Sequence, residues 1–271
     1  MAHWVRRRDC EIVAIRLKTP EQIEKMRLSG RLVHDVLQQL GKMAAPGVAT
    51  LELDKEAERL TLAAGAKCLF KGVPGRYGAR PFPGATCISI NEQVVHGIPS
   101  ERKIRDGDIV SIDFGVLLNG WCGDAADTFI VGEAPADVRR LVGVTRNSLA
   151  VALEMIRPDE KWSDIARAMQ EYIEGEGFAV VREFVGHGIG TEMHEDPKVP
   201  NFVSPELRAR DIVLKEGMVL AIEPMVNMGS CAVELAADRW TVLTKDRRPS
   251  AHYEHSVAVR SGGADVLTDG R

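Results

Sequence analysis

Two carboxylates follow apolar stretches at matching places in the two halves of the chain. Asp113 follows residues 109–112, and Glu223 follows residues 218–222. Burying an ionised carboxylate is costly unless a cation or hydrogen-bond donors compensate for the lost water. Either residue alone is explained by a strand end that turns to solvent. Their equivalent positions instead favour a shared chemical role.

Two further carboxylates are expected near this pair. A turn over residues 118–120 would join two strands and bring Asp124 beside Asp113. The alternating stretch 250–259 is expected to form a strand, with Glu254 on the same face as His252 and Ser256. The chain therefore offers four carboxylates that strand pairing could bring to one place.

Two histidines, His187 and His194, lie in the glycine-rich stretch 186–197, which cannot form a stable helix. Structural zinc sites prefer cysteine and histidine, and the stretch lacks the HExxH pattern. Carboxylate-rich sets with a histidine instead suit a pair of divalent ions, about 3.5–4 Å apart, that activates a water molecule. The residues alone therefore indicate a dinuclear metallohydrolase.

Paired helices are expected at the start of each half. The first begins with a capping box, in which Thr19 caps, Pro20 takes the first helical position and Gln22 reaches back, and it ends before Pro46. The next helices are expected to start at the caps Thr50 and Ser163, and another helix covers 136–157. The apolar positions that face inward are Ile23, Met26, Val33, Leu37, Leu40, Leu53, Ala57, Leu60, Val138, Leu141, Val142, Thr145, Leu149, Ala152, Ile165, Met169 and Tyr172.

The two halves look like a duplication. Residues 103–115 and 213–225 are expected to form strands, and aligning Gly107 with Gly217 also aligns Asp113 with Glu223, 110 residues apart. The tripeptide His-Gly-Ile occurs at 96–98 and 187–189, but its spacing of 91 residues does not share that register. Two such α/β halves could share one continuous sheet with a site between them.

The composition is that of an ordinary globular protein. The chain has 271 residues, 27% of them charged, with a net charge of −4, so its overall field does not favour nucleic acid. No apolar stretch reaches 18 residues, and the N-terminus does not read as a signal peptide. The run Arg6–Arg8 is expected to be a solvated tail. Five cysteines without a CxxC pair indicate a reduced, cytoplasmic chain.

The ordered motifs resemble the type I methionine aminopeptidase family, of the pita-bread fold. They are "CISINEQVVHGIP", "DGDIVSIDFG", "GWCGDAADTF", "GHGIGTEMHEDP", "AIEPMV" and "WTVLTKDRRPSAHYEHSVAV". The resemblance runs from Thr19 to about Val259. It implies an α/β (α+β) fold of two pseudo-symmetric halves around a curved, mainly antiparallel sheet, with helices outside and a dinuclear metal site in a central cleft.

The resemblance also implies roles for the residues. Asp113, Asp124, His187, Glu223 and Glu254 would hold two divalent ions (Co²⁺, Mn²⁺, Fe²⁺ or Zn²⁺), with Asp124 and Glu254 bridging them. Metal-activated water would attack the peptide bond, and Glu223 would shuttle the proton. His96 and His194 would contact the substrate rather than a metal. From the residues alone, both histidines are better explained by packing in the core.

A methionine pocket lined by Phe82, Cys87, Met193 and Trp240 is implied in the same way. Core packing is the alternative for each of them. Met193 stands where the family often has an aromatic residue, and His252 stands where it often has glutamine. A monovalent cation (Na⁺ or K⁺) is expected near Asn91 and Ser250.

The implied activity is removal of the N-terminal initiator methionine from nascent proteins when the second residue is small. The expected partners are N-terminal peptides of nascent proteins and, transiently, the ribosome, but neither DNA nor a membrane, and the expected state is a monomer. We expect one catalytic domain over 1–271, with tails at 1–18 and 261–271 and halves at about 19–135 and 136–260. A proline-directed aminopeptidase, which usually carries an additional N-terminal domain, and a non-catalytic binder of the same fold are the alternatives.

Overall fold

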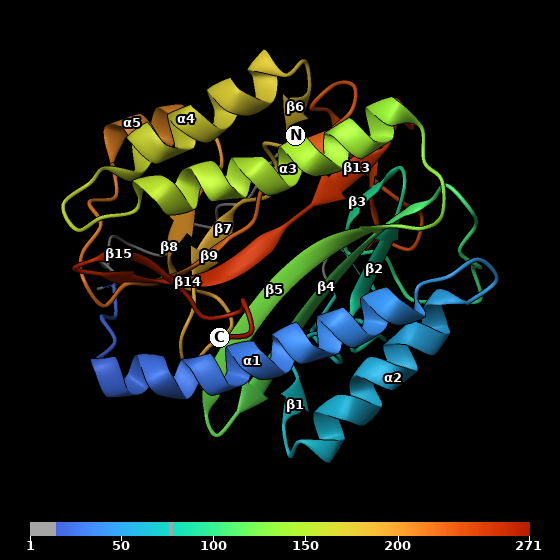
Figure 1. Ribbon diagram of the computed structural model, residues 1–271, viewed down its shortest axis with the longest axis horizontal. Coiled ribbons are helices and arrows are strands. Elements are labelled where there is room, and N and C mark those ends of the chain that lie inside the picture. Colours follow the sequence, from blue (N-terminus) through green and yellow to red (C-terminus); the bar gives the residue numbers. More distant parts are fainter. Residues whose placement is uncertain (1–14, 76–77) are drawn as a thin grey trace.

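The computed structural model describes residues 15–75 and 78–271 of the chain. The expectations for Arg6–Arg8 and Cys10 lie outside these residues. Helices and strands alternate along the chain, with two long helices at the start of each half (Figure 1). Within the described residues, no helix has the length and apolar character needed to cross a membrane.

One curved antiparallel sheet runs through both halves. Its main path has the order β1-β4-β5-β14-β9-β7-β8, and every pairing in it is antiparallel. The strands are β1 (Lys67–Cys68), β4 (Ile109–Leu118), β5 (Trp121–Ile130), β14 (Glu254–Arg260), β9 (Val219–Ile222), β7 (Gly186–Gly188) and β8 (Glu195–Val199). Strand β2 (Cys87–Ile90) also pairs with β4, and β15 (Gly263–Val266) pairs with β14. The halves meet where β5 pairs with β14.

Smaller sheets complete the fold. One has the order β13-β10-β6 and the other β11-β12-β3. Their strands are β13 (Ser250–His252), β10 (Met225–Asn227), β6 (Ala179–Val180), β11 (Val233–Leu235), β12 (Val242–Thr244) and β3 (Gln93–Val95). A short helix, α5 (Pro205–Ala209), follows β8.

The first helix pair, α1 (Pro20–Met43) and α2 (Thr50–Ala63), covers the first half of the sheet (Figure 1). The capping box is confirmed: Gln22 N donates to Thr19 Oγ1 at 3.3 Å, and Thr19 N donates to Gln22 Oε1 at 2.9 Å. Thr50 as a cap is wrong, because it is already helical and its hydroxyl donates to Ser100 O.

The second pair, α3 (Ala136–Met155) and α4 (Trp162–Gly175), covers the other half. Ser163 as a cap is also wrong. Asp211 accepts from both the Ser163 amide and its hydroxyl, at 3.0 and 2.5 Å, so a distant carboxylate serves this helix end. The predicted inward positions of the four helices are buried, except Leu60 and Tyr172, which are half-buried.

Two strand predictions need correction. The strands expected over 103–115 and 213–225 begin only at Ile109 and Val219, because Gly107 and Gly217 occupy tight turns with φ of 84° and 89°. The matching turns support the duplication. The strand expected over 250–259 is interrupted at Tyr253, and its two parts join different sheets.

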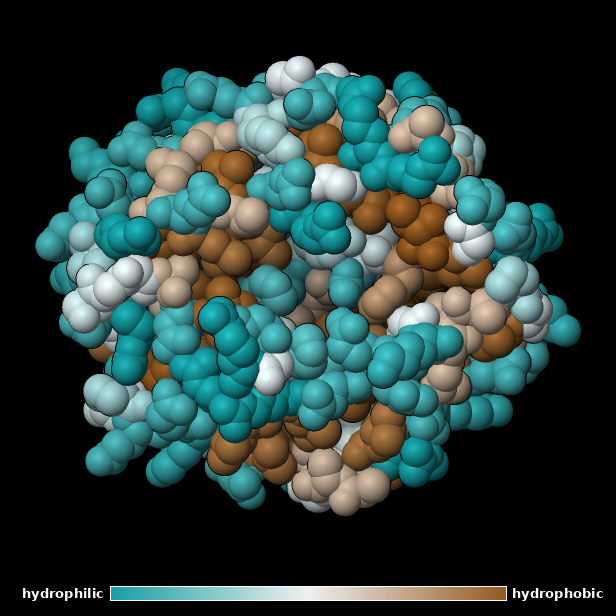
Figure 2. All heavy atoms as spheres, viewed as in Figure 1, coloured by the Kyte–Doolittle hydropathy of each residue, from teal (hydrophilic) through white to brown (hydrophobic). Residues whose placement is uncertain are grey.

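Apolar side chains form a core beneath each helix pair. The first core packs α1 and α2 against β4, whose Val110, Ile112 and Phe114 all point to the helices. The second packs α3 and α4 against β9 and β14. Strand alternation leaves Ser111 and Asp113 on the opposite, inner face of β4. On the outer surface in Figure 2, hydrophilic side chains cover most of the face, with apolar ones between them.

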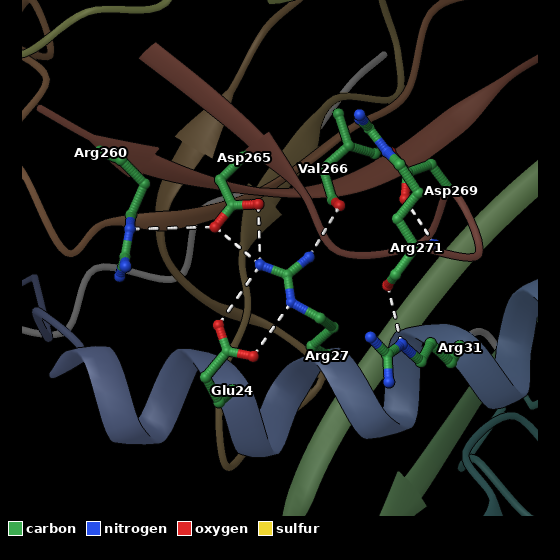
Figure 3. A network of polar contacts seen from close by, with 8 residues as sticks. All are labelled: Glu24, Arg27, Arg31, Arg260, Asp265, Val266, Asp269 and Arg271. Atoms are coloured by element: carbon green, nitrogen blue, oxygen red, sulfur yellow. Dashed lines mark hydrogen bonds and ion pairs between the residues drawn. The ribbon is translucent and has the colours of Figure 1, made fainter. Parts of the chain in front are cut away.

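The C-terminal segment is attached to α1 by a polar network (Figure 3). Arg27 Nη2 donates to both carboxylate oxygens of Asp265 at 2.8 Å, and Arg27 Nε donates to Glu24 at 3.2 Å. Arg27 Nη1 also reaches Val266 O, and Arg260 lies 3.8 Å from Asp265. The segment predicted as a C-terminal tail therefore extends the sheet through β15.

Candidate metal centre

The hairpin β4–β5 positions two of the predicted ligands. Asn119 and Gly120 both have positive φ, as the predicted two-residue turn requires, and every residue from Ile109 to Leu118 pairs across it. Asp124 is opposite Gly115, two residues beyond Asp113. The two carboxylates are therefore diagonal neighbours on the inner face of the sheet.

Glu254 comes from the neighbouring strand and is held by polar contacts of the strand backbone. Ser256 Oγ donates to Asp124 O at 2.8 Å and lies 3.2 Å from Asp124 N. Glu254 pairs with Ala126, so its side chain shares the inner face with Asp124. Despite the break at Tyr253, His252, Glu254 and Ser256 all face the centre, as the alternation predicted.

His187 comes from β7, in the second half of the chain. Its Nδ1 lies 2.9 Å from Gly188 O, which can only accept a hydrogen bond. Burial, and then His194, lowers the pKa of His187 to about 4, so the ring is neutral at pH 7. With the proton on Nδ1, the Nε2 lone pair is available to a metal.

Distances join these residues into one group. Ligand atoms of Asp124, His187 and Glu254 all lie within 4.8 Å of one another. His187 Nε2 is 3.9 Å from Asp124 Oδ2 and 3.8 Å from Glu223 Oε1. Glu223, just after β9, also lies 3.8 Å from His252 Nε2. Three segments far apart in sequence thus meet at one centre.

The electrostatics of the group fit bound cations. Burial, and then the other carboxylates, raises the pKa values of Asp113, Glu223 and Glu254 well above their usual range. Burial raises the pKa of Asp124 to about 7. Among the described residues, the buried atoms Asp113 Oδ1, Asp124 Oδ1 and Glu254 Oε1 have no hydrogen-bond partner. Divalent ions would satisfy these oxygens and offset the repulsion.

His252 is the additional histidine of the centre. It is buried, its Nε2 has no hydrogen-bond partner among the described residues, and burial lowers its pKa to about 3, with His96 contributing. The sequence identified it as a departure from the family without assigning a role.

The two histidines predicted to contact substrate lie beside the centre. The His194 ring is exposed and lies 4.4 Å from the His187 ring, between centroids. His96 has a positive φ of 58° and packs its ring edge-to-face with Phe184 at 5.4 Å and Trp240 at 6.5 Å. Both therefore have side-chain neighbours at the site rather than within the helix-packed cores.

The four predicted pocket residues share one small apolar cluster. Cys87 pairs directly with Asp113 across β2 and β4, so the cluster adjoins the centre. The ring centroids of Phe82 and Trp240 are 5.1 Å apart, and Trp240 Nε1 donates to Arg80 O. Sequence reasoning missed three members, although one of them stands in the quoted "HGIP" motif. The cluster contains Leu69, Phe70, Phe82, Cys87, Ile98, Met193 and Trp240.

Fold and site together define a metallopeptidase of the pita-bread fold. The chain belongs to metallopeptidase family M24, whose model matches residues 24–261. It is 47% identical over 251 residues to methionine aminopeptidase 1 of Bacillus subtilis (strain 168), covering 93% of this chain and 98% of that protein. It is 44% identical to the methionine aminopeptidase of Escherichia coli (strain K12), covering 94% of each.

Solved structures show the same fold. The methionine aminopeptidase of Thermotoga maritima matches with a TM-score of 0.88 and 41% identity, over 94% of this chain and 99% of that one. The prolidase of Pyrococcus horikoshii OT3 matches with a TM-score of 0.74 at 20% identity, and this chain covers 64% of it. The latter likeness is one of fold alone.

Proposed function

We propose that this chain removes the N-terminal methionine from newly made proteins whose second residue is small. The observation that carries the proposal is the apolar cluster of Phe82, Cys87, Met193 and Trp240 directly beside the carboxylate centre. An unbranched thioether side chain suits an apolar, polarizable lining. The chain's M24 membership and its similarity to methionine aminopeptidases support the same activity.

Two divalent ions, Co²⁺, Mn²⁺, Fe²⁺ or Zn²⁺, would be held by Asp113, Asp124, His187, Glu223 and Glu254. When bound, such ions polarise the peptide carbonyl and lower the pKa of water. Asp124 and Glu254, at the join of the two halves, would bridge the ions. The neutral His187 ring would contribute Nε2.

The remaining polar groups act on the substrate. His194, beside His187, would donate a hydrogen bond to the peptide group as charge develops on its oxygen. His96 would contact the same peptide group from the other side of the pocket. Glu223, whose pKa is raised by burial and by Asp113, is suited to hold a proton and pass it to the leaving amine.

Other predicted ligands and partners belong to the same proposal. A monovalent cation would lie near Asn91 and Ser250, which are adjacent because Ser250 N donates to Asn91 O at 2.8 Å. Action on nascent chains in the cytoplasm, transient ribosome contact and a monomeric state are expectations for solution experiments.

A peptide panel tests the activity. Peptides beginning Met-Gly, Met-Leu and Ala-Gly, and one with proline second, are incubated with metal-supplied protein, and products are identified by mass. We expect methionine release from the Met-Gly peptide, far less from Met-Leu, and none of the first residue from Ala-Gly. Preferred cleavage of the proline peptide would instead support the proline-directed alternative, and no cleavage the non-catalytic one.

A further inference from the structure

We propose that the buried ion pair between Lys18 and Glu195 is a positioning device that holds His194 against the metal centre. Lys18 Nζ lies 2.7 Å from Glu195 Oε2, and the two side chains are only 5% and 6% exposed. The pair joins residues 177 positions apart, and Glu195 directly follows His194. The functional part of this inference rests on the proposed function.

The Glu195 carboxylate organises the whole loop that carries His194. Its second oxygen, Oε1, accepts from the amides of Thr191 and Glu192 at 3.0 and 3.3 Å. Burial alone would raise the pKa of Glu195, but Lys18 and these amides lower it, so the carboxylate stays ionised. At the start of the loop, Gly190 O accepts from Cys122 N at 2.8 Å. The loop is therefore fixed at both ends.

Lys18 is itself held firmly. Its amide donates to Gly217 O at 2.7 Å, in the turn that leads into β9 and Glu223. A side chain at Gly190 would place its Cβ 2.5 Å from Glu195 Oε1 and 2.7 Å from Lys18 Cε. The loop backbone is thus in close contact with the ion pair, so displacement of the pair must move the loop.

Strand pairing connects the pair to both site histidines. Glu195 is the first residue of β8 and pairs with Gly188, the residue after His187, at a register shift in the ladder. Such irregularities often redirect side chains at active sites. His187 and His194 therefore flank one strand position that Lys18 anchors from outside.

A buried ion pair is weak evidence for stability, since apolar replacements of similar volume are often neutral. Positioning is a better explanation of this pair than stability, because a misplacement of about 1 Å at an active site can cost about 100-fold in rate. Lys18 and Glu195 do not contact the carboxylate centre, so bound metal should not depend on them.

Four variants test the proposal: Lys18→Met, Lys18→Arg, the double variant Lys18→Met with Glu195→Gln, and the control Arg16→Gln. The control removes an exposed ion pair to Glu192, 3.8 Å long, between the same two segments. Folding is checked by circular dichroism, bound metal by elemental analysis, and kcat and KM with a Met-Gly peptide. The His194 imidazole NMR signal is assigned by its loss in His194→Ala.

We expect Lys18→Met and the double variant to keep their metal, to lose at least tenfold in kcat with little change in KM, and to shift the His194 signal. Lys18→Arg should recover most of the activity, and Arg16→Gln should match the unaltered protein. If Lys18→Met fails to fold, the double variant leaves no unpaired buried charge and carries the test. A folded double variant with unchanged kcat and an unchanged His194 signal would overturn the proposal. If the unaltered protein does not cleave methionyl peptides, the proposed function fails, and the NMR signal still tests the positioning.

Discussion

His187 Nε2 lies 3.9 Å from Asp124 Oδ2, although the two residues come from different halves of the chain. The hydrogen bond geometry of His187 Nδ1 leaves Nε2 facing the carboxylates. Two groups held this close without a hydrogen bond are arranged for a shared cation rather than for each other. The first four predictions below examine this centre and its neighbours.

Replacing Asp124 by asparagine should lower the bound metal and remove most activity. In the chelator-treated state, the variant should be at least as stable as the unaltered protein above pH 7, because burial raises the pKa of Asp124 to about 7 and its charge is unfavourable there. Metal content and thermal unfolding with and without chelator measure both effects. Asp127→Asn, on the outer face of the same strand, is the matched control and should keep its metal. An Asp124→Asn protein that binds two ions and is fully active would refute the assignment.

The metal-free protein should lose stability as pH rises from about 6.5 to 8. The raised carboxyl pKa values mean that the folded chain binds more protons than the unfolded chain, whose carboxyl pKa values are about 4, so stability present at low pH is lost as pH rises through the folded values. Each excess proton corresponds to about 1.4 kcal/mol of unfolding free energy per pH unit.

The lowered pKa values of His187 and His252 act in the opposite direction. Their contribution is present above about 6.5 and lost as pH falls toward 4 and 3. The window above 6.5 therefore isolates the carboxylates. Melting temperatures with chelator and with excess metal at pH 6.5, 7.2 and 8 should diverge as pH rises. Parallel curves would mean that the carboxylates do not repel in the folded chain.

Replacement of the two neighbouring histidines should have different effects. His194→Ala should keep its metal and its stability and lose about 10²–10³ in kcat, with KM little changed, since the lost hydrogen bond matters in the transition state. His187→Ala should lose metal, and added metal should partly restore activity. Parallel metal analysis and kinetics compare them. Equal metal loss in both variants would make His194 a ligand.

Met193→Ala should weaken methionine peptides by about 2 kcal/mol or less, through lost apolar contact in a half-buried position. Metal binding should not change. Met169→Ala, fully buried in α4, is the control and should cost about 2–5 kcal/mol of stability without altering KM. Unfolding of Met193→Ala with unaltered substrate affinity would make Met193 a core residue only.

Local signals in the sequence predicted the elements that local chemistry controls. The capping box of Thr19 and Gln22 involves four consecutive residues, and the turn at Asn119-Gly120 needs only two left-handed residues. Both were found where expected. Alternation also placed Glu254 on the correct face, because it continues unchanged through the break at Tyr253.

The parts that escaped prediction depend on distant partners. Ser163 has the character of a cap, but Asp211, 48 residues later, serves that helix end. Phe70 joins the pocket across a loop without periodicity, and Lys18, assigned to a tail, is buried against Glu195. Pairings of this kind are set by tertiary packing, so a local pattern contains no signal for them.

The central claim is that this chain uses divalent metal to release N-terminal methionine. The most direct measurement follows free methionine released from a Met-Ala-Ser peptide by chelator-stripped protein as metal is returned stepwise. We predict no release without metal, a rise that levels off at two ions per chain, and a remaining peptide that begins with alanine and is not shortened further. Release that is independent of metal, or continued removal of the following residues, would contradict the claim.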